Sequence, residues 1–304
     1  MTRTAPRSID QYLEQLRAEL AGEDPALMQD ALYDAEEYLR AELAANPGRS
    51  EADMLELIAS TYGAPDEVAA AYRDTEARVK VAMAPPPRPP AASPLRRFFG
   101  VFGDVRAWTS LFFMLLTLAT GIFYFTFAVV GLSLSAGLAV LIVGVPFFLG
   151  FIGLLRVIAL GEGRLIEAMT GERMPRRPVH PGPARGLGAR ILAMLRDPRT
   201  WTTLAYFVLM LPLGVAWFVI AVVGLSLGLG MFLGAAIEGA RLLGADLPGG
   251  LEVHSKIVEG FVANPLGLLV IALLGLLVLT LLMHLARAIG RGHARLAKVL
   301  LVHR

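Results

Sequence analysis

The chain has 304 residues, 55% of them hydrophobic, and a mean hydropathy of +0.58, which excludes an ordinary soluble domain. Its net charge of +2 is unevenly spread, because residues 1–95 hold 17 acidic and 9 basic side chains whereas residues 96–304 hold 9 acidic and 19 basic ones. The absence of cysteine excludes disulfides, thiolate metal sites and cysteine nucleophiles.

The acidic segment, residues 1–80, has the pattern of a small bundle of amphipathic helices. Ser8 and Gln11 have the spacing of a capping box, and apolar residues follow at helical spacing. Pro25 starts a second helix, Asn46-Pro47-Gly48 ends it, and Gly63-Ala64-Pro65-Asp66 breaks and restarts the chain. The polar first twenty residues do not resemble a signal peptide, so we expect internal helices to direct membrane insertion.

This segment resembles the HAAS domain, a small helical signalling module that bacteria attach to membrane segments. The resemblance covers about residues 8–75 and rests on Tyr12-Leu13-Leu16, on the acidic stretch 34–39 and on Gly63-Ala64-Pro65-Asp66-Glu67-Val68. It implies a cytoplasmic domain whose candidate partner is a PadR-like transcriptional regulator. It implies no catalytic residue.

Residues 81–95 form a proline-rich linker, which we expect to be an extended spacer. The basic and aromatic residues 96–99 then lead into the membrane segment.

The membrane segment contains an internal repeat. Residues 104–134 recur at 197–227, with 16 of 31 positions identical. Each copy holds about twenty apolar residues, enough for a helix that crosses about 30 Å of hydrocarbon. The similarity of Ala288–Gly292 to Ala159–Gly163 extends the repeat to a whole hairpin, so we expect one hairpin repeat at 96–196 and a second at 197–304.

Four spans are expected, near residues 108–131, 137–157, 201–225 and 265–286. Glycine and serine residues at 131–137 and 224–228 suggest turns at the outer end of each repeat. The loop at 156–199 carries nine arginines against four acids, so the positive-inside rule places this loop and both termini in the cytoplasm. Both copies of the repeat would then run in the same direction, as a parallel 2+2 bundle.

The second repeat carries an insertion, residues 228–265, that is slightly acidic and is expected outside the membrane. Residues 231–243 could lie as an amphipathic helix on the outer leaflet. Because the insertion breaks the symmetry of the repeat, it is the first candidate place for a cue.

The membrane segment, about 95–304, resembles the actinobacterial sensor domain that serves as the membrane input of many histidine kinases. Trp201, Leu211-Pro212-Leu213-Gly214, Trp217-Phe218 and Gly224–Gly228 carry this resemblance. No phospho-acceptor or ATP-binding segment follows, so kinase activity is not implied for this chain.

The repeat and the span ends point to seven candidate positions of structural or signalling importance. Pro146 and Pro212 are expected flexible points, with Pro146 a kink, and the two tryptophans are expected to set helix depth at the inner interface. His284 could sense protonation or could simply be hydrogen-bonded within the bundle. The seven positions are Trp108, Trp201, Gly121, Gly214, Pro146, Pro212 and His284.

Other chemistries are disfavoured by the sequence. The five histidines show no metal-ligand spacing, and no catalytic, cofactor-binding or metal site is expected. The span centres lack ionisable residues, which disfavours ion-coupled transport. The arginine-rich loop is first a topogenic signal; its second interpretation is docking on anionic lipid or on the acidic residues 1–80. Nucleic-acid binding is not expected, because the attached domain is acidic.

The sequence therefore predicts an all-α protein of the bacterial inner membrane: a small cytoplasmic helical bundle and a four-helix transmembrane domain built from two tandem hairpin repeats. The favoured function is a non-enzymatic sensor or regulator that passes an envelope or lipid cue to a cytoplasmic partner. The alternatives are a structural or transport-accessory membrane subunit and a lipid-handling protein. The expected partners are the lipid bilayer, a transcriptional regulator or membrane subunit, and a second copy of the chain.

Overall fold

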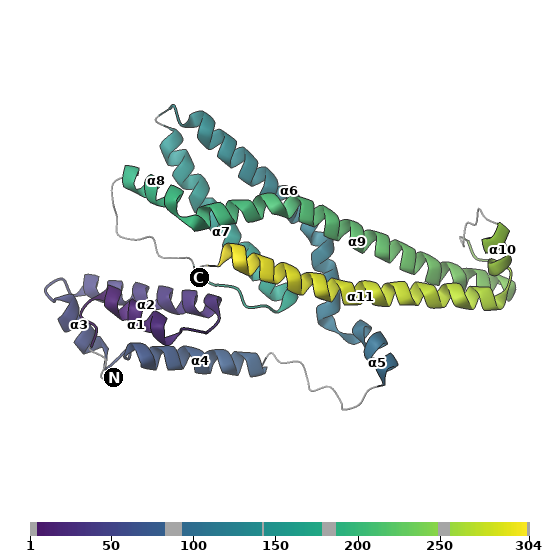
Figure 1. Cartoon of the computed structure of the whole chain (residues 1–304), viewed down its shortest axis with the longest axis horizontal. Helices are drawn as coiled ribbons and strands as arrows, with labels where there is room; N and C mark the ends of the chain where they lie inside the picture. The colour runs from purple at the N-terminus through teal and green to yellow at the C-terminus, as the bar shows by residue number, and fades with distance from the viewer. Residues whose placement is uncertain (1–4, 83–92, 142, 178–186, 249–255, 303–304) are drawn as a thin grey trace.

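The computed structural model describes residues 5–82, 93–141, 143–177, 187–248 and 256–302. Within these ranges the chain forms eleven α-helices and one short 3-10 helix, and no strand, which confirms the all-α prediction. Figure 1 shows a small helical bundle at the N-terminus beside two long hairpins that cross each other.

The N-terminal bundle consists of α1 (Ile9–Glu19), α2 (Pro25–Ala45), α3 (Glu51–Ile58) and α4 (Pro65–Ala82). The helix starts follow the predicted signals, because Ser8 accepts a hydrogen bond from the backbone N–H of Gln11 and Asp24 caps α2 just before Pro25. Gly63 adopts a φ of +105°, a left-handed conformation that a glycine takes without strain, and the chain turns there into α4. The local chain punctuation therefore decides where these helices begin and end.

The core of the bundle holds apolar side chains from all four helices together with the buried Tyr12, and the partly buried Tyr62 and Tyr72 pack against it. The Tyr12 hydroxyl donates to the Gly63 carbonyl at 2.9 Å, and the Tyr72 hydroxyl donates to Asp34 at 2.9 Å. Burial raises the pKa of all three hydroxyls, and it raises that of Tyr62 to about 12. The folded bundle therefore favours neutral tyrosines.

We expect the bundle to lose stability in alkali. A pKa that is higher in the folded state than in the unfolded state adds to the free energy of unfolding. This stabilisation is fully present below the ordinary tyrosine pKa of about 10 and is lost as the pH rises through about 12. Helical circular dichroism and tyrosinate absorbance, followed from pH 8 upward on the full chain in detergent, should change together in this range. Tyr62→Phe should move the midpoint upward, whereas an unchanged midpoint would show that Tyr62 does not limit stability. Tyr33→Phe serves as the control.

The membrane segment begins with two short elements, α5 (Pro94–Phe99) and the 3-10 helix Gly100–Gly103. Four long helices follow, with the shorter α8 (Leu187–Arg196) and α10 (Lys256–Val262) in the connections. Among the described residues, these four are the helices long and apolar enough to cross a membrane: α6 (Val105–Leu138), α7 (Gly144–Thr170), α9 (Pro198–Leu242) and α11 (Pro265–Leu301).

The predicted outer turns are wrong. α6 continues through Gly131–Gly137 to Leu138, so the second span begins at Gly144 and not near residue 137. α9 likewise runs unbroken through 224–228 to Leu242, so residues 231–242 extend a 45-residue helix and do not form a separate interfacial helix. Glycine in a long apolar helix marks close packing here: a Cβ at Gly228 would meet the Leu279 side chain at 2.6 Å.

The predicted parallel arrangement of the repeat is also contradicted. α6 packs along α9. The residue numbers of the contacting positions increase along α9 as they decrease along α6, so the two helices run antiparallel. The contacts are Tyr124 with Phe207, Gly121 with Met210, and Thr117 with Gly214. The tip joining α6 to α7 and the tip joining α9 to α11 therefore lie at different ends of the domain (Figure 1).

This contact has approximate two-fold symmetry. Thr117 and Met210 occupy equivalent positions of the repeat, as do Gly121 and Gly214. A Cβ at Gly121 would lie 2.5 Å from the Met210 carbonyl oxygen, and a Cβ at Gly214 would lie 2.2 Å from the Thr117 carbonyl oxygen. Each copy thus presents to the other the same glycine surface, as the subunits of a two-fold dimer do. The repeated segments therefore form the interface between the two hairpins.

Candidate functional site

A cluster of polar side chains lies in the interior of the four long helices. Glu162 on α7 is 1% exposed, and both of its carboxylate oxygens accept hydrogen bonds. The Tyr124 hydroxyl on α6 donates to Oε2 at 2.7 Å, and the Tyr206 hydroxyl on α9 donates to Oε1 at 2.8 Å. His293 on α11 lies 3.0 Å from the Tyr206 hydroxyl. The cluster therefore joins all four helices.

The surroundings of this cluster are apolar and aromatic. Phe207 stacks on Tyr124 with ring centroids 4.8 Å apart, and Phe113 packs edge-on against His293 at 4.9 Å. Among the described residues, Glu162 makes no salt bridge, and Nδ1 of His293 is buried without a hydrogen-bond partner. At the repeat position equivalent to Tyr124 stands Trp217, whose buried indole nitrogen also lacks a partner in the described chain. Only one end of the two-fold interface thus carries the polar cluster.

A second site joins the N-terminal bundle to the membrane helices. α7 ends at Thr170 and is capped by Gly171, which has a φ of +75°, and the chain then turns so that Arg173 faces the bundle. The Arg173 guanidinium contacts Asp30 on α2 at 3.0 Å and pairs with Glu76 on α4. These side chains are 15%, 7% and 9% exposed, so the ion pair is largely shielded from water. Met174, the next residue, is buried against the membrane helices.

Asp30 is the centre of this interface. Its Oδ1 accepts hydrogen bonds from the backbone amides of Arg176 and Arg177 at 2.8 and 2.9 Å. Burial raises the pKa of Asp30, and the two amides and Arg173 offset this effect only in part. For the guanidinium of Arg176, the nearby Glu167 carboxylate raises the pKa. The buried carboxyl thus depends on donors that the 173–177 segment supplies.

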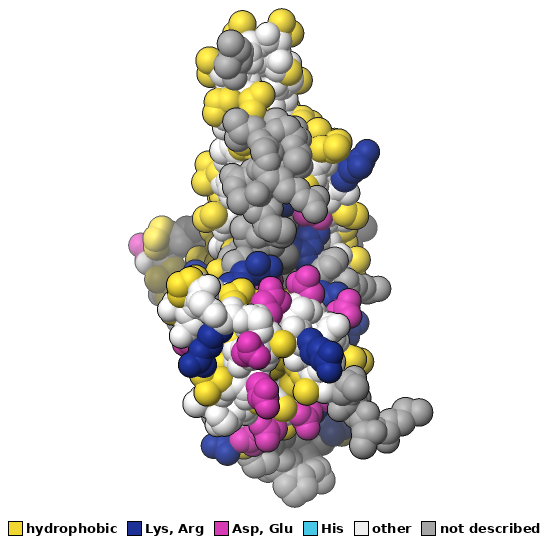
Figure 2. Space-filling model, turned by 90° about the vertical axis from the view of Figure 1, so that its left-hand side faces the viewer, with side chains coloured by type: hydrophobic (Ala, Val, Ile, Leu, Met, Phe, Trp, Pro, Cys, Tyr) yellow, Lys and Arg dark blue, Asp and Glu magenta, His cyan; other side chains and the backbone are white. Residues whose placement is uncertain are grey.

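Two further contacts widen the interface. Lys298, near the end of α11, contacts Asp24 at 2.5 Å, and Gln29 donates to the Arg177 carbonyl at 2.7 Å. Figure 2 shows acidic side chains gathered on the N-terminal bundle. Arg173 and Arg177 of the arginine-rich loop dock on this acidic bundle, as in the second interpretation of that loop, which also allowed docking on anionic lipid.

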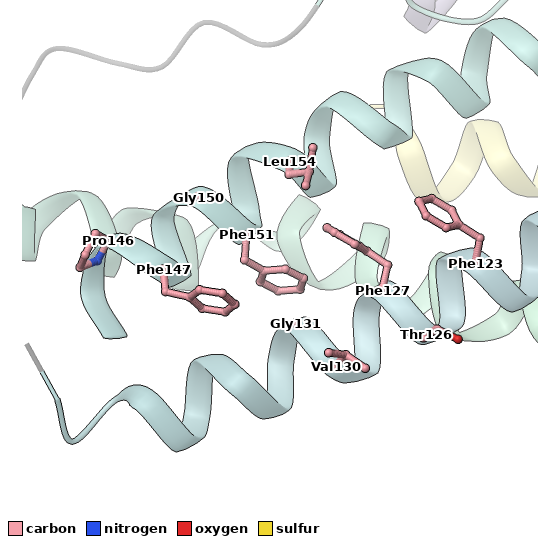
Figure 3. Close-up of a pocket in the computed structure, with 10 residues that line it drawn as sticks. All are labelled: Phe123, Thr126, Phe127, Val130, Gly131, Pro146, Phe147, Gly150, Phe151 and Leu154. Carbon is pink, nitrogen blue, oxygen red and sulfur yellow. The ribbon is translucent and has the colours of Figure 1, made fainter. Parts of the chain in front are cut away.

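An apolar pocket of about 520 Å³ lies between α6 and α7. Phe127 and Phe151 face each other across it with ring centroids 5.3 Å apart (Figure 3). Of the ten lining residues, Thr126 is the only one with a hydroxyl. The pocket therefore suits a hydrocarbon chain and offers no anchor for a charged group.

The seven positions singled out by the sequence fall in different places. Gly121 and Gly214 come together at the centre of the two-fold interface. Trp108 and Trp201 are half-exposed, and each indole donates to the carbonyl six residues earlier, at 2.8 and 2.7 Å. The two copies therefore keep the same tryptophan geometry, which agrees with a structural role at the helix start.

The remaining three positions differ from one another. Pro146 lies in the first turn of α7, where a proline removes no intrahelical hydrogen bond, so the predicted kink is wrong. Pro212 does lie inside α9, beside the crossing with α6. His284 Nε2 lies 3.0 Å from the carbonyl oxygen of Phe98, which ties α5 to α11 as in the hydrogen-bonded interpretation. None of these residues belongs to the polar cluster.

The sequence reasoning missed Glu162 and His293. Residues 161–164 contain two charged side chains and two glycines, a pattern typical of a return to water, yet Glu162 is buried. A residue spacing could have helped, because Glu162 and Ile166 share one face of α7 and both are buried. Arg173 was part of the basic loop, but nothing in the sequence distinguished it from its neighbours.

The fold and these sites define an all-helical protein with four helices long and apolar enough to cross a membrane and a docked N-terminal bundle. Residues 113–301 match the model of the Sensor family, described as "Putative sensor", and this match covers more than half of the chain. The protein belongs to the Sensor family. The match does not include the N-terminal bundle, so the HAAS resemblance stays a prediction. Comparison with curated proteins and with solved structures gave no match.

Proposed function

We propose that this protein is a non-enzymatic integral membrane sensor that passes an envelope or lipid cue to a cytoplasmic partner through its N-terminal bundle. The sensor family supports the general role. The observation that carries the finer proposal is the shielded ion pair of Arg173 with Asp30 and Glu76. A charged contact between two parts of one chain can be made and broken, and it covers one face of the bundle while it is made.

The proposed mechanism is a change between a docked and a released bundle. In the docked state, the 173–177 segment covers Asp30 and part of α2. A cue that favours another packing of the four long helices would move the end of α7 and so shift this equilibrium. Release would expose Asp30, Asp34 and Glu76, the acidic face of the bundle, to the partner.

The bundle contacts Arg173, just after α7, and Lys298, near the end of α11. It lies at the other end of the protein from the tip between α9 and α11 (Figure 1). We assign this end, with both termini, to the cytoplasm, because arginine and lysine gather there. The tip between α9 and α11 would then face the outside, and its residues 243–264 are the first place to look for an outer cue. Deleting this tip should abolish the response to such a cue and leave α9 intact up to Leu242.

Affinity capture tests the proposal. The tagged full chain, purified from native membranes, should retain a soluble regulator on the bundle, with a PadR-like protein the candidate by resemblance. Arg173→Ala should change the amount retained, because it alters the exposure of the acidic face. Membrane subunits retained in stoichiometric amounts, equally by the wild type and by Arg173→Ala, would support the scaffold alternative and contradict the sensor proposal.

A second candidate function, lipid handling, is favoured by the apolar pocket between α6 and α7. This pocket lies within one hairpin, not between the two. We expect native mass spectrometry to find lipid bound to the wild-type chain and less lipid on Gly150→Phe, because a Cβ at Gly150 meets nothing within 4 Å and a larger group can fill the pocket. Equal lipid on Gly150→Phe and on a control with the change at the open Gly230 would exclude this pocket.

A further inference from the structure

We propose that Glu162 is a proton-binding site and that proton uptake there releases the N-terminal bundle. The inference rests on the docking contact of the proposed function and adds the ligand, a proton, and the place where it binds. It starts from the burial of Glu162 and from its hydrogen bonds to three other helices, directly or through Tyr206.

We assign a carboxylate to the docked state, because each oxygen of Glu162 lies within hydrogen-bond distance of one tyrosine hydroxyl. Tyr124 and Tyr206 each donate to one oxygen of Glu162, so neither oxygen needs a proton of its own. Since Tyr206 uses its hydrogen on Glu162, His293 donates to Tyr206 through Nε2. A neutral imidazole then has a bare Nδ1, which agrees with the absence of a partner at that atom.

The same geometry places an added proton on the carboxylate and not on the histidine. A second N–H on His293, at Nδ1, would find no acceptor among the described residues. A proton on Glu162 instead cancels the one charge of the cluster, so the charge-assisted hydrogen bonds with Tyr124 and Tyr206 become weaker, neutral ones. Proton uptake therefore weakens the contacts of α7 with α6 and α9.

Other charged groups near Glu162 are already engaged. On α7, Arg156 pairs with Asp197 at the start of α9, and Glu167 pairs with Arg176. α6 presents Tyr124 to the carboxylate, α9 presents Tyr206, and α11 presents His293 through Tyr206. Within the described chain, no cation balances the Glu162 carboxylate.

The cluster is connected to the docking contacts through two helices. Glu162 lies about one and a half turns before Glu167, which holds the Arg176 that binds Asp30. His293 lies at the same spacing before Lys298, which binds Asp24. A shift of α7 relative to α11 at the cluster would therefore move both anchors of the bundle.

Protonation of Asp30 has the opposite effect on docking. Its raised pKa means that the docked state holds a proton more tightly than an exposed aspartate does, so acid at Asp30 favours docking. Release on acidification must therefore come from elsewhere, and a substitution at Glu162 separates the two effects.

The test uses two independent readouts on the full chain in lipid nanodiscs. Infrared difference spectroscopy detects a protonated buried carboxyl as the pH is lowered. Electron spin resonance between labels at Glu56→Cys and Arg295→Cys, both exposed in the structure, measures the separation of bundle and α11. The native chain has no cysteine, so only these positions are labelled.

In the wild type, we expect a carboxyl band to appear on acidification and the ratio of docked to released distances to fall about tenfold with it. Glu162→Gln should remove the band and give mostly released distances at every pH. Tyr206→Phe should keep the band but move its appearance to higher pH, because the carboxylate loses a donor. Glu238→Gln, on the far part of α9, should behave as wild type.

Two results would overturn the inference. The proton site would be excluded if no carboxyl band titrates, or if neither Glu162→Gln nor Tyr206→Phe changes the band. A band that titrates without a change of distance would exclude its control of the bundle. Neither result affects the docking proposal, which fails only if Arg173→Ala leaves the distances docked.

Discussion

Replacing Arg173 with alanine is expected to release the N-terminal bundle from the membrane helices. The substitution leaves Asp30 buried without its cation and leaves Glu76 with Lys80 at 3.8 Å, and removing one partner of a shielded ion pair costs about 3–5 kcal/mol. A loss of this size exceeds what Lys298 and Asp24, a single partly exposed pair, can offset. The same spin-label distances should shift from one docked population to a broad released one.

Arg177→Ala is the matched control for this prediction. Arg177 also pairs with the bundle, through Asp34, but it is 51% exposed, and an exposed pair contributes at most about 1 kcal/mol. We expect Arg177→Ala to remain docked. If Arg173→Ala also remains docked, the ion pair does not hold the bundle, and the proposed switch has no basis.

Replacing Gly214 with alanine is expected to destabilise the four long helices. Its Cβ would lie 2.2 Å from the Thr117 carbonyl oxygen, which is backbone and cannot rotate away. Such overpacking costs about 1–3 kcal/mol or more, because α6 and α9 must separate. Thermal unfolding of the full chain in detergent, followed by circular dichroism, should show a lower midpoint.

Gly230→Ala, in the same helix, is the control. A Cβ there meets nothing within 4 Å. Alanine favours the helix over glycine by up to about 1 kcal/mol of free energy, so the midpoint should stay unchanged or rise slightly. Gly121→Ala should resemble Gly214→Ala, because the two-fold contact places it 2.5 Å from the Met210 carbonyl oxygen. A parallel packing of the repeat would not require these two contacts, so equal midpoints for Gly214→Ala and Gly230→Ala would contradict the antiparallel crossing.

The helices themselves were largely predictable. Ser8, Asp24 and Gly63 act through hydrogen bonds and backbone angles within a few residues, and such signals are visible in the sequence. The long apolar stretches likewise predict spans, since length and composition alone decide whether a helix can cross a bilayer. The ends of the spans were less predictable, because glycine and serine at 131–137 suit a turn and a packed helix equally well.

The candidate sites were predictable only in part. The opposite charges of the bundle and the loop indicated that they could dock, since the sign of a charge is a property of the sequence. The choice of Arg173 over the other arginines depends on Gly171 and on the position of Asp30 after folding. Glu162 escaped notice because its charge and flanking glycines indicate water, whereas the neighbouring helices bury it.

The sequence by itself determined the helical class, the duplicated segment, the number of long apolar helices and the charge difference between the two parts. Only the tertiary structure decided which faces of the apolar helices meet. A helix that is apolar all round has no preferred buried side, so its sequence does not choose between parallel and antiparallel packing. The polar cluster joins residues 38, 44 and 87 positions apart, and it exists only because that choice brings Tyr124, Tyr206 and His293 around Glu162.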